Sequence, residues 1–300
     1  MSRLKYLGRE IKRNTSAYLF LLPWSILFFT FTLAPVAISL FYGFTYYNIL
    51  EPARWIGFDN YINMLTIDNV FPLAMKNTFV LAAVTGPVGY ISSFLFAWFI
   101  SELRPKLRAI MVVIFYAPSI SGAVYLIWKI VFDSDAYGYL NGFLMKLGFI
   151  NDPIDWLTNP DYMMAVVIIV SLWMSLGAGF LSFVAGLQNM DRSQFEAGYV
   201  DGITNRWQEL WFITLPSMRP QLMFGAVMSI SSAFSVGGIT TALCGFPSTD
   251  YAVHTLVNHI SDYGGTRFEM GYACALATLL FLMMIVANRA IQVLLSKVGS

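Results

Sequence analysis

The sequence predicts an all-α membrane protein with six transmembrane helices and both termini in the cytoplasm. Of the 300 residues, 57% are hydrophobic and only 12% are charged, which is about half the charge of a typical soluble domain. With the N-terminus inside, 13 of the 18 Lys and Arg residues fall in cytoplasmic segments, as the positive-inside rule requires. Six stretches also lack charged residues, and each is long enough to cross a bilayer as a helix. These six runs are Ala17–Leu50, Asn77–Ser101, Ala109–Trp128, Tyr162–Met190, Pro220–Thr249 and Met270–Asn288.

The chain begins with a short basic segment, residues 1–16, which predicts a topology signal at the lipid headgroups. The first apolar run is too long for a signal-peptide core and is followed by no convincing cleavage site, so we expect a retained helix. Residues 17–296 then form one six-helix bundle, and the whole chain, 1–300, is a single domain. In the outer segment that follows the first run, apolar residues recur at helix-like spacing, which indicates a helix at the membrane interface. They are Trp55, Phe58, Tyr61, Ile62 and Leu65.

The longest outer connection, residues 133–160, is acidic and contains a short amphipathic pattern at Leu140, Phe143, Leu144 and Leu147. This pattern predicts a short helix, which either packs on the bundle or docks an outside partner. Cys244 and Cys274 fall near the outer ends of two predicted helices, where a disulfide or simple apolar packing would both be consistent.

Prolines and glycines interrupt the predicted spans. Pro35, Pro87 and Pro118 should break the first three helices, and Gly177 and Gly179 should loosen the fourth. Taken singly, each of these residues is explained by close packing between helices. Taken together, they indicate a bundle whose helices move relative to one another.

The residues that enzymes need are missing. The two histidines, His254 and His259, are five residues apart, which would place them about 140° apart on a helix. The sequence therefore predicts no metal site and no catalytic residue. It has no nucleophile elbow and no phosphate-binding loop, and a net charge of +1 gives no basic field for nucleic acid. None of the six runs contains Asp, Glu or His, so proton-coupled transport lacks its usual groups.

A polar segment, residues 191–216, separates the fourth and fifth apolar runs. Asp191 and Gln194 have the spacing of a capping box at the start of a short helix. Gly202 marks a turn, and a second short helix should begin at Thr204 or Asn205 and end at Pro216. Such helices are too apolar to float free, so one face should rest on the bundle or enter another protein.

The stretch "EAGYVDGITNRWQELWFITLP" within this segment resembles the EAA loop of permease subunits of binding-protein-dependent, ATP-driven (ABC) importers. In that loop Glu-Ala-Ala is followed, after two variable positions, by Asp-Gly-Ala, and the loop ends in Ile-x-Leu-Pro. The departures here are Gly198 and Ile203 in place of alanines, and one extra residue before the Leu-Pro pair. The resemblance implies that the loop is a coupling helix for an ATPase, with coupling residues Glu196, Ala197, Gly198, Asp201, Gly202, Leu215 and Pro216.

Other stretches, such as "YLFLLPWSILFFTFTLAPVAISLFYGF" and "FYAPSISGAVYLIWKIVF", are similar to carbohydrate-importer permeases. The family implies a multi-pass protein of the prokaryotic cell membrane. It would work with a second permease subunit that is a different chain, two ATPase subunits that bind ATP and Mg, and an extracellular solute-binding protein that delivers the sugar. The chain itself would be no enzyme and would hold no cofactor.

Several alternatives stay open at this point. The solute could be something other than a sugar, and the chain could be a self-sufficient secondary transporter or a membrane scaffold. If it is a sugar permease, aromatic and hydroxyl side chains near mid-membrane are candidates for the substrate path. These candidates are Tyr116, Ser119, Trp173, Ser175, Ser229, Ser232 and Ser235.

Overall fold

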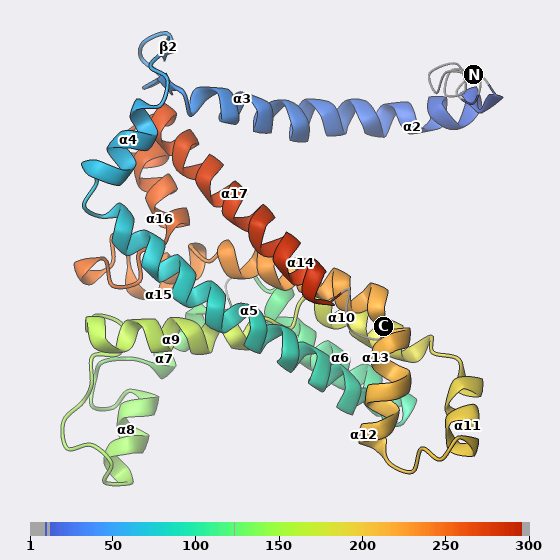
Figure 1. The fold of residues 1–300 in the computed structure, drawn as a ribbon. Coiled ribbons are helices and arrows are strands. Elements are labelled where there is room, and N and C mark those ends of the chain that lie inside the picture. Colours follow the sequence, from blue (N-terminus) through green and yellow to red (C-terminus); the bar gives the residue numbers. More distant parts are fainter. Residues whose placement is uncertain (1–9, 11–12, 123, 296–300) are drawn as a thin grey trace.

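The computed structural model describes residue 10 and residues 13–122 and 124–295. The predicted basic segment, residues 1–16, lies mainly outside the described residues. The chain is mostly helical (Figure 1). The α-helices are α2 (Thr15–Phe28), α3 (Ala34–Tyr42), α4 (Asp59–Thr66), α5 (Phe71–Ser101), α6 (Pro105–Ile120), α7 (Leu126–Val131), α8 (Tyr139–Lys146), α9 (Pro160–Trp173), α10 (Ala178–Gln188), α11 (Arg192–Val200), α12 (Arg206–Glu209), α13 (Leu215–Ser217), α14 (Arg219–Phe234), α15 (Gly238–Cys244), α16 (Leu256–Ser261) and α17 (Met270–Leu295).

The remaining elements are short. Strands β1 (Thr45–Tyr46) and β2 (Arg54–Trp55) pair antiparallel at one end of the molecule. One 3₁₀ turn, η3, covers Thr249–Tyr251. Three π-helical segments interrupt or extend α-helices, and they are η1 (Phe29–Leu33), η2 (Leu210–Thr214) and η4 (Asp262–Thr266).

Within the described residues, four helical stretches are long and apolar enough to cross a membrane: Thr15–Tyr42, Phe71–Ser101, Pro160–Gln188 and Met270–Leu295. A fifth is possible if α14 and α15, bent by 42°, form one broken span. The third predicted helix falls short. Its first part, α6, has 16 residues and so measures about 24 Å, because the backbone turns extended at Ser121 before α7 begins. In contrast, Pro87 lies inside α5 without ending it, so the predicted break of that helix is wrong.

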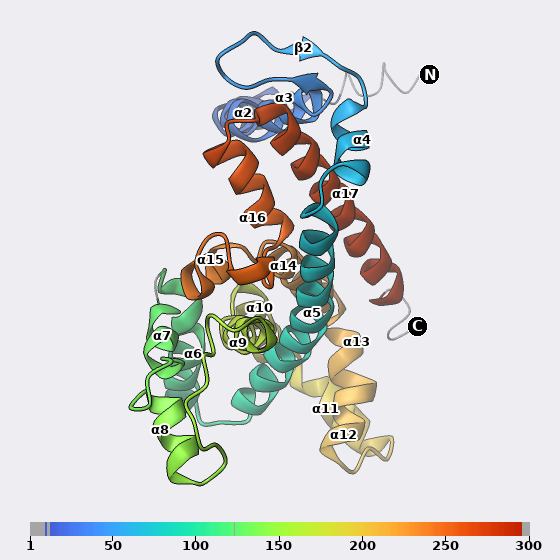
Figure 2. The same ribbon diagram turned by 90° about the vertical axis from the view of Figure 1, so that its left-hand side faces the viewer.

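The centre of the molecule is formed by α5, α10 and α14, which pack against one another, with α17 against α14. Phe180 and Phe183 of α10 are fully buried there. The Phe183 ring meets Phe94 and Tyr90 of α5 edge-on, at centroid distances of 5.5 and 5.6 Å. Figure 2 shows α9 and α10 end-on near the middle of this arrangement, with α5 crossing beside them. Apolar burial therefore holds α9, α10 and α14 around one side of α5.

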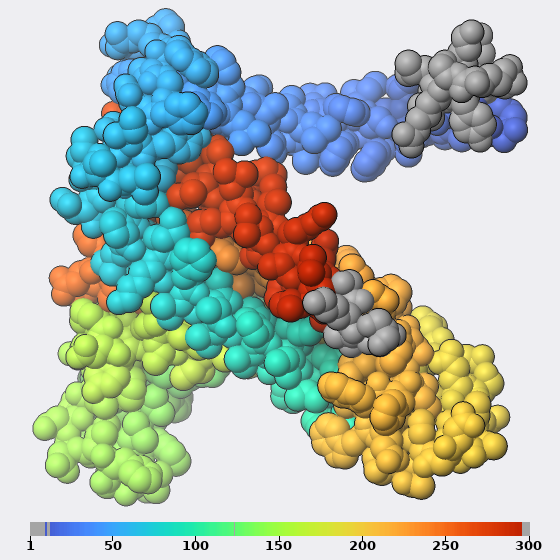
Figure 3. Space-filling view, viewed as in Figure 1, coloured from blue at the N-terminus to red at the C-terminus, as the bar shows by residue number. Residues whose placement is uncertain are grey.

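The first span stands apart from this centre. None of the residues of α2 and α3 is buried within the chain. Figure 1 and the space-filling view in Figure 3 show this span projecting from the end that carries β2 and α4. It contacts the rest mainly where α3 meets α17. An apolar surface of this length is consistent with a membrane environment.

The outer connection forms the short helix that its pattern predicts, α8. Leu140 packs on the bundle side, whereas Phe143 and Leu147 are more than half exposed. The segment is built around Asn141, which is fully buried. Its amide donates to the carbonyls of Asp133, Asp135 and Ile154, and its oxygen accepts from the Trp156 indole at 2.8 Å.

The histidines lie differently from the helical prediction. His254 precedes Thr255, the N-cap of α16, so only His259 is on a helix and the two rings face each other. His254 Nε2 is 3.2 Å from His259 Nδ1, and His259 Nε2 is 2.8 Å from Asp68 Oδ2. A carboxylate can only accept, so His259 Nε2–H donates to Asp68, and the neutral ring accepts from His254 Nε2–H. Tyr272 also donates to Asp68 Oδ2. In the described part of the chain no cluster of three or more such ligands could hold a metal ion.

This cluster should make the protein sensitive to acid. Burial is the main cause that lowers the pKa of His254 to about 4. In the unfolded chain the pKa of His254 has the ordinary histidine value of about 6.5. Between that pH and about 4, the unfolded chain therefore binds a proton on His254 and the folded chain does not. Stability should fall as the pH drops from about 6.5 to about 4. Thermal unfolding in detergent at intervals across this window measures it, and His254→Gln should flatten the slope. An unchanged slope in that variant would rule out His254 as the cause.

Candidate functional site

A cavity of about 310 Å³ lies where α9 ends and α10 begins. Its wall comes from α5, α6, α9, α10, α14 and α15, and no residue in it is ionisable or aromatic. The lining residues are Thr85, Gly89, Ser119, Ser171, Met174, Ser175, Gly177, Gly179, Met228, Ser229, Ser232, Ala233, Val236 and Ile239. Hydroxyl groups therefore line an uncharged chamber together with glycines, methionines and the apolar side chains of Ala233, Val236 and Ile239.

The structure brings four of the seven predicted path residues to this cavity: Ser119, Ser175, Ser229 and Ser232. Ser119 Oγ donates to the carbonyl of Leu176 at 2.6 Å, in the break between α9 and α10. This bond satisfies a backbone group that the interrupted helix leaves free.

The other three candidates do not line the cavity. Tyr116 packs among apolar side chains around α5 and α10. Trp173 meets Trp128 edge-on at 5.4 Å. Ser235 is exposed, and its hydroxyl donates to Ser231 O. The sequence also missed two hydroxyl residues of the wall, Thr85 and Ser171. The spacing of Ser171 and Ser175, four apart on one helical face, could have indicated the second.

The polar segment, residues 191–216, consists of two helical pieces joined by a turn at Gly202. Asp191 caps the first piece, α11, by accepting from Ser193 N at 3.0 Å. The predicted capping box is wrong in its second half, because Gln194 accepts from Ser217 Oγ at 2.8 Å instead. That bond fastens α11 to α13. The glycine has φ +95°, a conformation that other residues adopt only with strain.

The second piece begins within the predicted range of Thr204 or Asn205, with Asn205 as the N-cap, whose side chain accepts from Gln208 N at 2.9 Å. Its predicted end at Pro216 is wrong. The chain passes through η2 and α13 in helical conformation, and the bend comes at Met218 (φ −91°, ψ 8°) before α14 starts. Proline is tolerated because it occupies the first turn of α13, where its missing N–H is not needed. Leu215 and Pro216 are both partly buried.

Two of the departures from the EAA pattern, Gly198 and Ile203, lie next to each other in the structure. Gly198 is buried in α11. A Cβ placed on it would lie 2.7 Å from Ile213 Cδ1 and 3.1 Å from Ile203 Cδ1. The side chains of Ile213 and Ile203 thus fill the space that an alanine methyl at position 198 would occupy. Ile203 itself stands where the EAA pattern has its other alanine.

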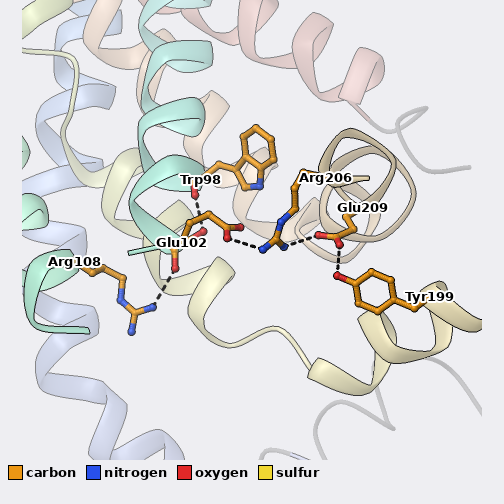
Figure 4. A network of polar contacts seen from close by, with 7 residues as sticks. Trp98, Glu102, Arg108, Tyr199, Arg206 and Glu209 are labelled. Atoms are coloured by element: carbon orange, nitrogen blue, oxygen red, sulfur yellow. Dashed lines mark hydrogen bonds and ion pairs between the residues drawn. The ribbon is translucent and has the colours of Figure 1, made fainter. Parts of the chain in front are cut away.

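A polar network joins this loop to the end of α5 (Figure 4). Arg206 Nη1 donates to Glu209 Oε2 at 2.7 Å, and its Nη2 donates to Glu102 Oε2 at 2.8 Å. Tyr199 of α11 donates its hydroxyl to Glu209 Oε1 at 2.5 Å. The rings of Trp98 and Trp207 lie alongside, with centroids 5.4 Å apart. Contacts between side chains therefore tie α11, α12 and α5 together, and sequence reasoning missed them because Glu102 is 104 residues from Arg206.

Glu209 is the centre of the network, at 5% exposure. Burial alone would raise the pKa of its carboxyl, but the bonds from Tyr199 and Arg206 outweigh burial and lower it. The carboxylate stays charged because two donors hold it. The hydrogen bond between Tyr199 and Glu209 also raises the pKa of the Tyr199 hydroxyl.

Beside this network is a second cavity of about 500 Å³. Its wall includes Arg108, Arg192 and Glu196, together with Glu102 and Arg206. Glu196, Ala197, Asp201 and Gly202 are all exposed. The predicted coupling residues thus fall into two groups, with these four on the surface and Gly198, Leu215 and Pro216 against the body.

We expect Gly198→Ala to destabilise the loop by about 1–2 kcal/mol, because the new methyl overpacks a filled space. The double variant Gly198→Ala/Ile203→Ala should lose less than the sum of the two single changes, because truncating Ile203 gives the new methyl room on that side. Thermal unfolding of the single and double variants forms the double-mutant cycle. Simple additivity of the two effects would show that the residues do not share this space.

Comparison with known proteins identifies the family of the chain. Residues 6–300 match the family described as "Binding-protein-dependent transport system inner membrane component". The chain is 36% identical over 279 residues to a probable ABC transporter permease, YesP of Bacillus subtilis (strain 168), covering 90% of this chain and 87% of that protein. It is 27% identical to the arabinooligosaccharide permease AraP of the same strain, covering 92% and 87%.

A crystal structure of a bacterial ABC transporter that imports the acidic polysaccharide alginate is also similar. One of its chains aligns with a TM-score of 0.79 and 26% identity, covering 98% of this chain and 100% of that chain. On these matches, the chain belongs to the family of binding-protein-dependent transport system inner membrane components.

Proposed function

We propose that this chain is the permease subunit of an ATP-driven importer, and that its small hydroxyl-lined cavity is part of the path of a sugar or oligosaccharide. One observation carries the proposal: a single helix serves both sites. The middle of α5 lines the cavity with Thr85 and Gly89, and its end contacts the loop through Glu102. Movement of the loop can therefore reach the cavity through one rigid element.

We infer six transmembrane helices, with the broken stretch α6–α7 as the third and α14–α15 as the fifth. In Figure 1 the start of α2, the end of α17 and the loop helices α11 and α12 all lie towards the right-hand side, opposite β2, α4 and α8. This arrangement supports cytoplasmic termini and a cytoplasmic loop, and agrees with the excess of basic residues on that side.

The proposed assembly contains a second, different permease chain, two ATPase subunits that hold ATP and Mg, and an extracellular binding protein. A similar solved structure is an alginate transporter in complex with a periplasmic protein bound to an alginate pentasaccharide, and AraP is a permease for arabinooligosaccharides. In this assembly the EAA-like loop, with Glu196 and Gly202 on its surface, seats in an ATPase subunit. Closure of the ATPase pair then switches the path between its inward- and outward-facing states.

Reconstitution in proteoliposomes tests the proposal. Sugar uptake should require the ATPase subunits, ATP and the loaded binding protein, and the loaded binding protein should in turn accelerate ATP hydrolysis. Uptake without an ATPase would indicate a secondary transporter, and assembly without uptake of any solute would indicate a scaffold. Uptake of a solute of another class would correct the substrate.

A further inference from the structure

Ser171 is the one residue of the described cavity wall with a buried hydroxyl that lacks any hydrogen-bond partner. It lies in α9, close to the end of that helix, and is 7% exposed. A buried hydroxyl without a hydrogen-bond partner destabilises the folded chain, so a ligand that supplies the missing hydrogen bond should bind favourably here.

Several hydroxyls in the spanning helices, or directly after them, donate to carbonyls three or four residues back in the same segment. Thr85 donates to the carbonyl of Leu81 at 2.7 Å, four residues back. Thr278 and Ser235 make the same kind of bond, at 2.8 and 2.7 Å. Ser175, one turn beyond Ser171, donates to Leu172 O at 2.7 Å. A helix thus offers its serines a partner on its own backbone, and Ser171 does not use one.

The residues of the cavity wall restrict the class of ligand that could form a hydrogen bond with the Ser171 hydroxyl. A serine hydroxyl both donates and accepts, as a sugar hydroxyl does, and the lining residues include no charged group. An anionic sugar would enter this chamber without a compensating cation on this chain's side, at a high desolvation cost.

We propose that Ser171 binds a hydroxyl group of the passing substrate, and that the site takes uncharged sugars. This inference rests on the proposed function of the chain as a sugar permease and names the substrate class for that same cavity. Ser171 then acts as a specificity-determining residue, because its hydrogen bond is complete only while sugar is present.

The test compares Ser171→Ala with Ser235→Ala in the complete transporter in proteoliposomes. Ser235 is a matched control, since its hydroxyl lies outside the cavity and already donates to its own backbone. Loss of one neutral hydrogen bond should lower initial sugar uptake by roughly three- to tenfold in Ser171→Ala. The empty complex should unfold at the same or a higher temperature, because an unsatisfied hydroxyl has been removed. Ser171→Thr, which keeps the hydroxyl, should retain uptake, and Ser235→Ala should match the wild type.

Two further outcomes separate this inference from the proposed function. Uptake is followed by mass spectrometry of vesicle contents, with a mixture of neutral di- to tetrasaccharides and a matched mixture of their uronates. If the wild-type complex imports neither mixture, the proposed function is wrong. If it imports sugars but Ser171→Ala is unaffected, or is less stable than wild type, the role of Ser171 is wrong. Equal import of uronates and neutral sugars would overturn the uncharged substrate class.

Discussion

Gly202→Asp should insert and fold but lose stimulation of ATP hydrolysis by the loaded binding protein, by more than tenfold. The glycine has φ +95°, and a Cβ there would meet nothing within 4 Å in this chain. The cost within the chain is therefore backbone strain, about 1–2 kcal/mol, and no clash. The greater effect should arise at the ATPase, because the exposed turn would present a new charged side chain to the surface in which it seats. The measurements are ATPase rate with and without binding protein and sugar, and ATPase subunit retained on pull-down.

Gly148→Asp is the matched control for strain. Gly148 follows α8 on the outer connection, has φ +76° and also has open space around it. Both variants should lose similar stability, and only Gly202→Asp should lose coupling. Glu196→Ala, which removes an exposed charge from the same loop, should weaken retention more mildly. Full stimulation and retention in Gly202→Asp would show that the loop does not seat in the ATPase.

Glu209→Ala should have the second large effect, a loss of about 1–3 kcal/mol in the stability of the loop together with weaker coupling. The change removes a buried carboxylate, leaves the Tyr199 hydroxyl without its acceptor, and leaves Arg206 with Glu102 alone. Arg206 is 59% exposed, so water can solvate it, which keeps the loss moderate. Hydrogen exchange of the loop and thermal unfolding measure the stability, and stimulated ATPase activity measures the coupling.

Two comparisons sharpen this result. Glu209→Gln keeps an acceptor for Tyr199 but loses the charge that holds Arg206, so it should fall between the wild type and Glu209→Ala. Glu51→Ala breaks the exposed pair of Glu51 and Arg54, 3.1 Å apart, and should change stability by about 0–1 kcal/mol. If Glu209→Ala is as mild as Glu51→Ala, the network does not hold the loop.

Local patterns in the sequence were sufficient for most of the long helices, for the cap at Asp191 and for the helix start near Asn205, because hydrophobic spacing and capping chemistry act over a few residues. These patterns failed for side chains whose positions depend on contacts with segments far away in the sequence. His254 and His259 face each other because the chain enters α16 at Thr255, not because of any helical angle. Trp173 was predicted in the path from its position on the broken helix, yet its ring packs against Trp128.

The candidate cavity was partly predictable for the same reason. Mid-membrane serines next to glycines indicated Ser119 and Ser175, which the structure does place on its wall. Nothing in the local sequence distinguishes Ser171, whose hydroxyl is unsatisfied, from Ser235, whose hydroxyl bonds its own helix. The partnership of Glu102 with Arg206 also depends on how α5 and the loop meet in space.

The packing of Gly198 against Ile203 and Ile213 has a consequence for how such loops are recognised in new genomes. A motif that scores each column separately penalises this chain twice, once for the absent methyl at position 198 and once for the larger side chain at position 203. Physically these are one event, the transfer of a few carbon atoms from one side of a contact to the other. Searches that treat the two columns as a pair would find permeases in which evolution has made this exchange and which single-column scoring ranks too low.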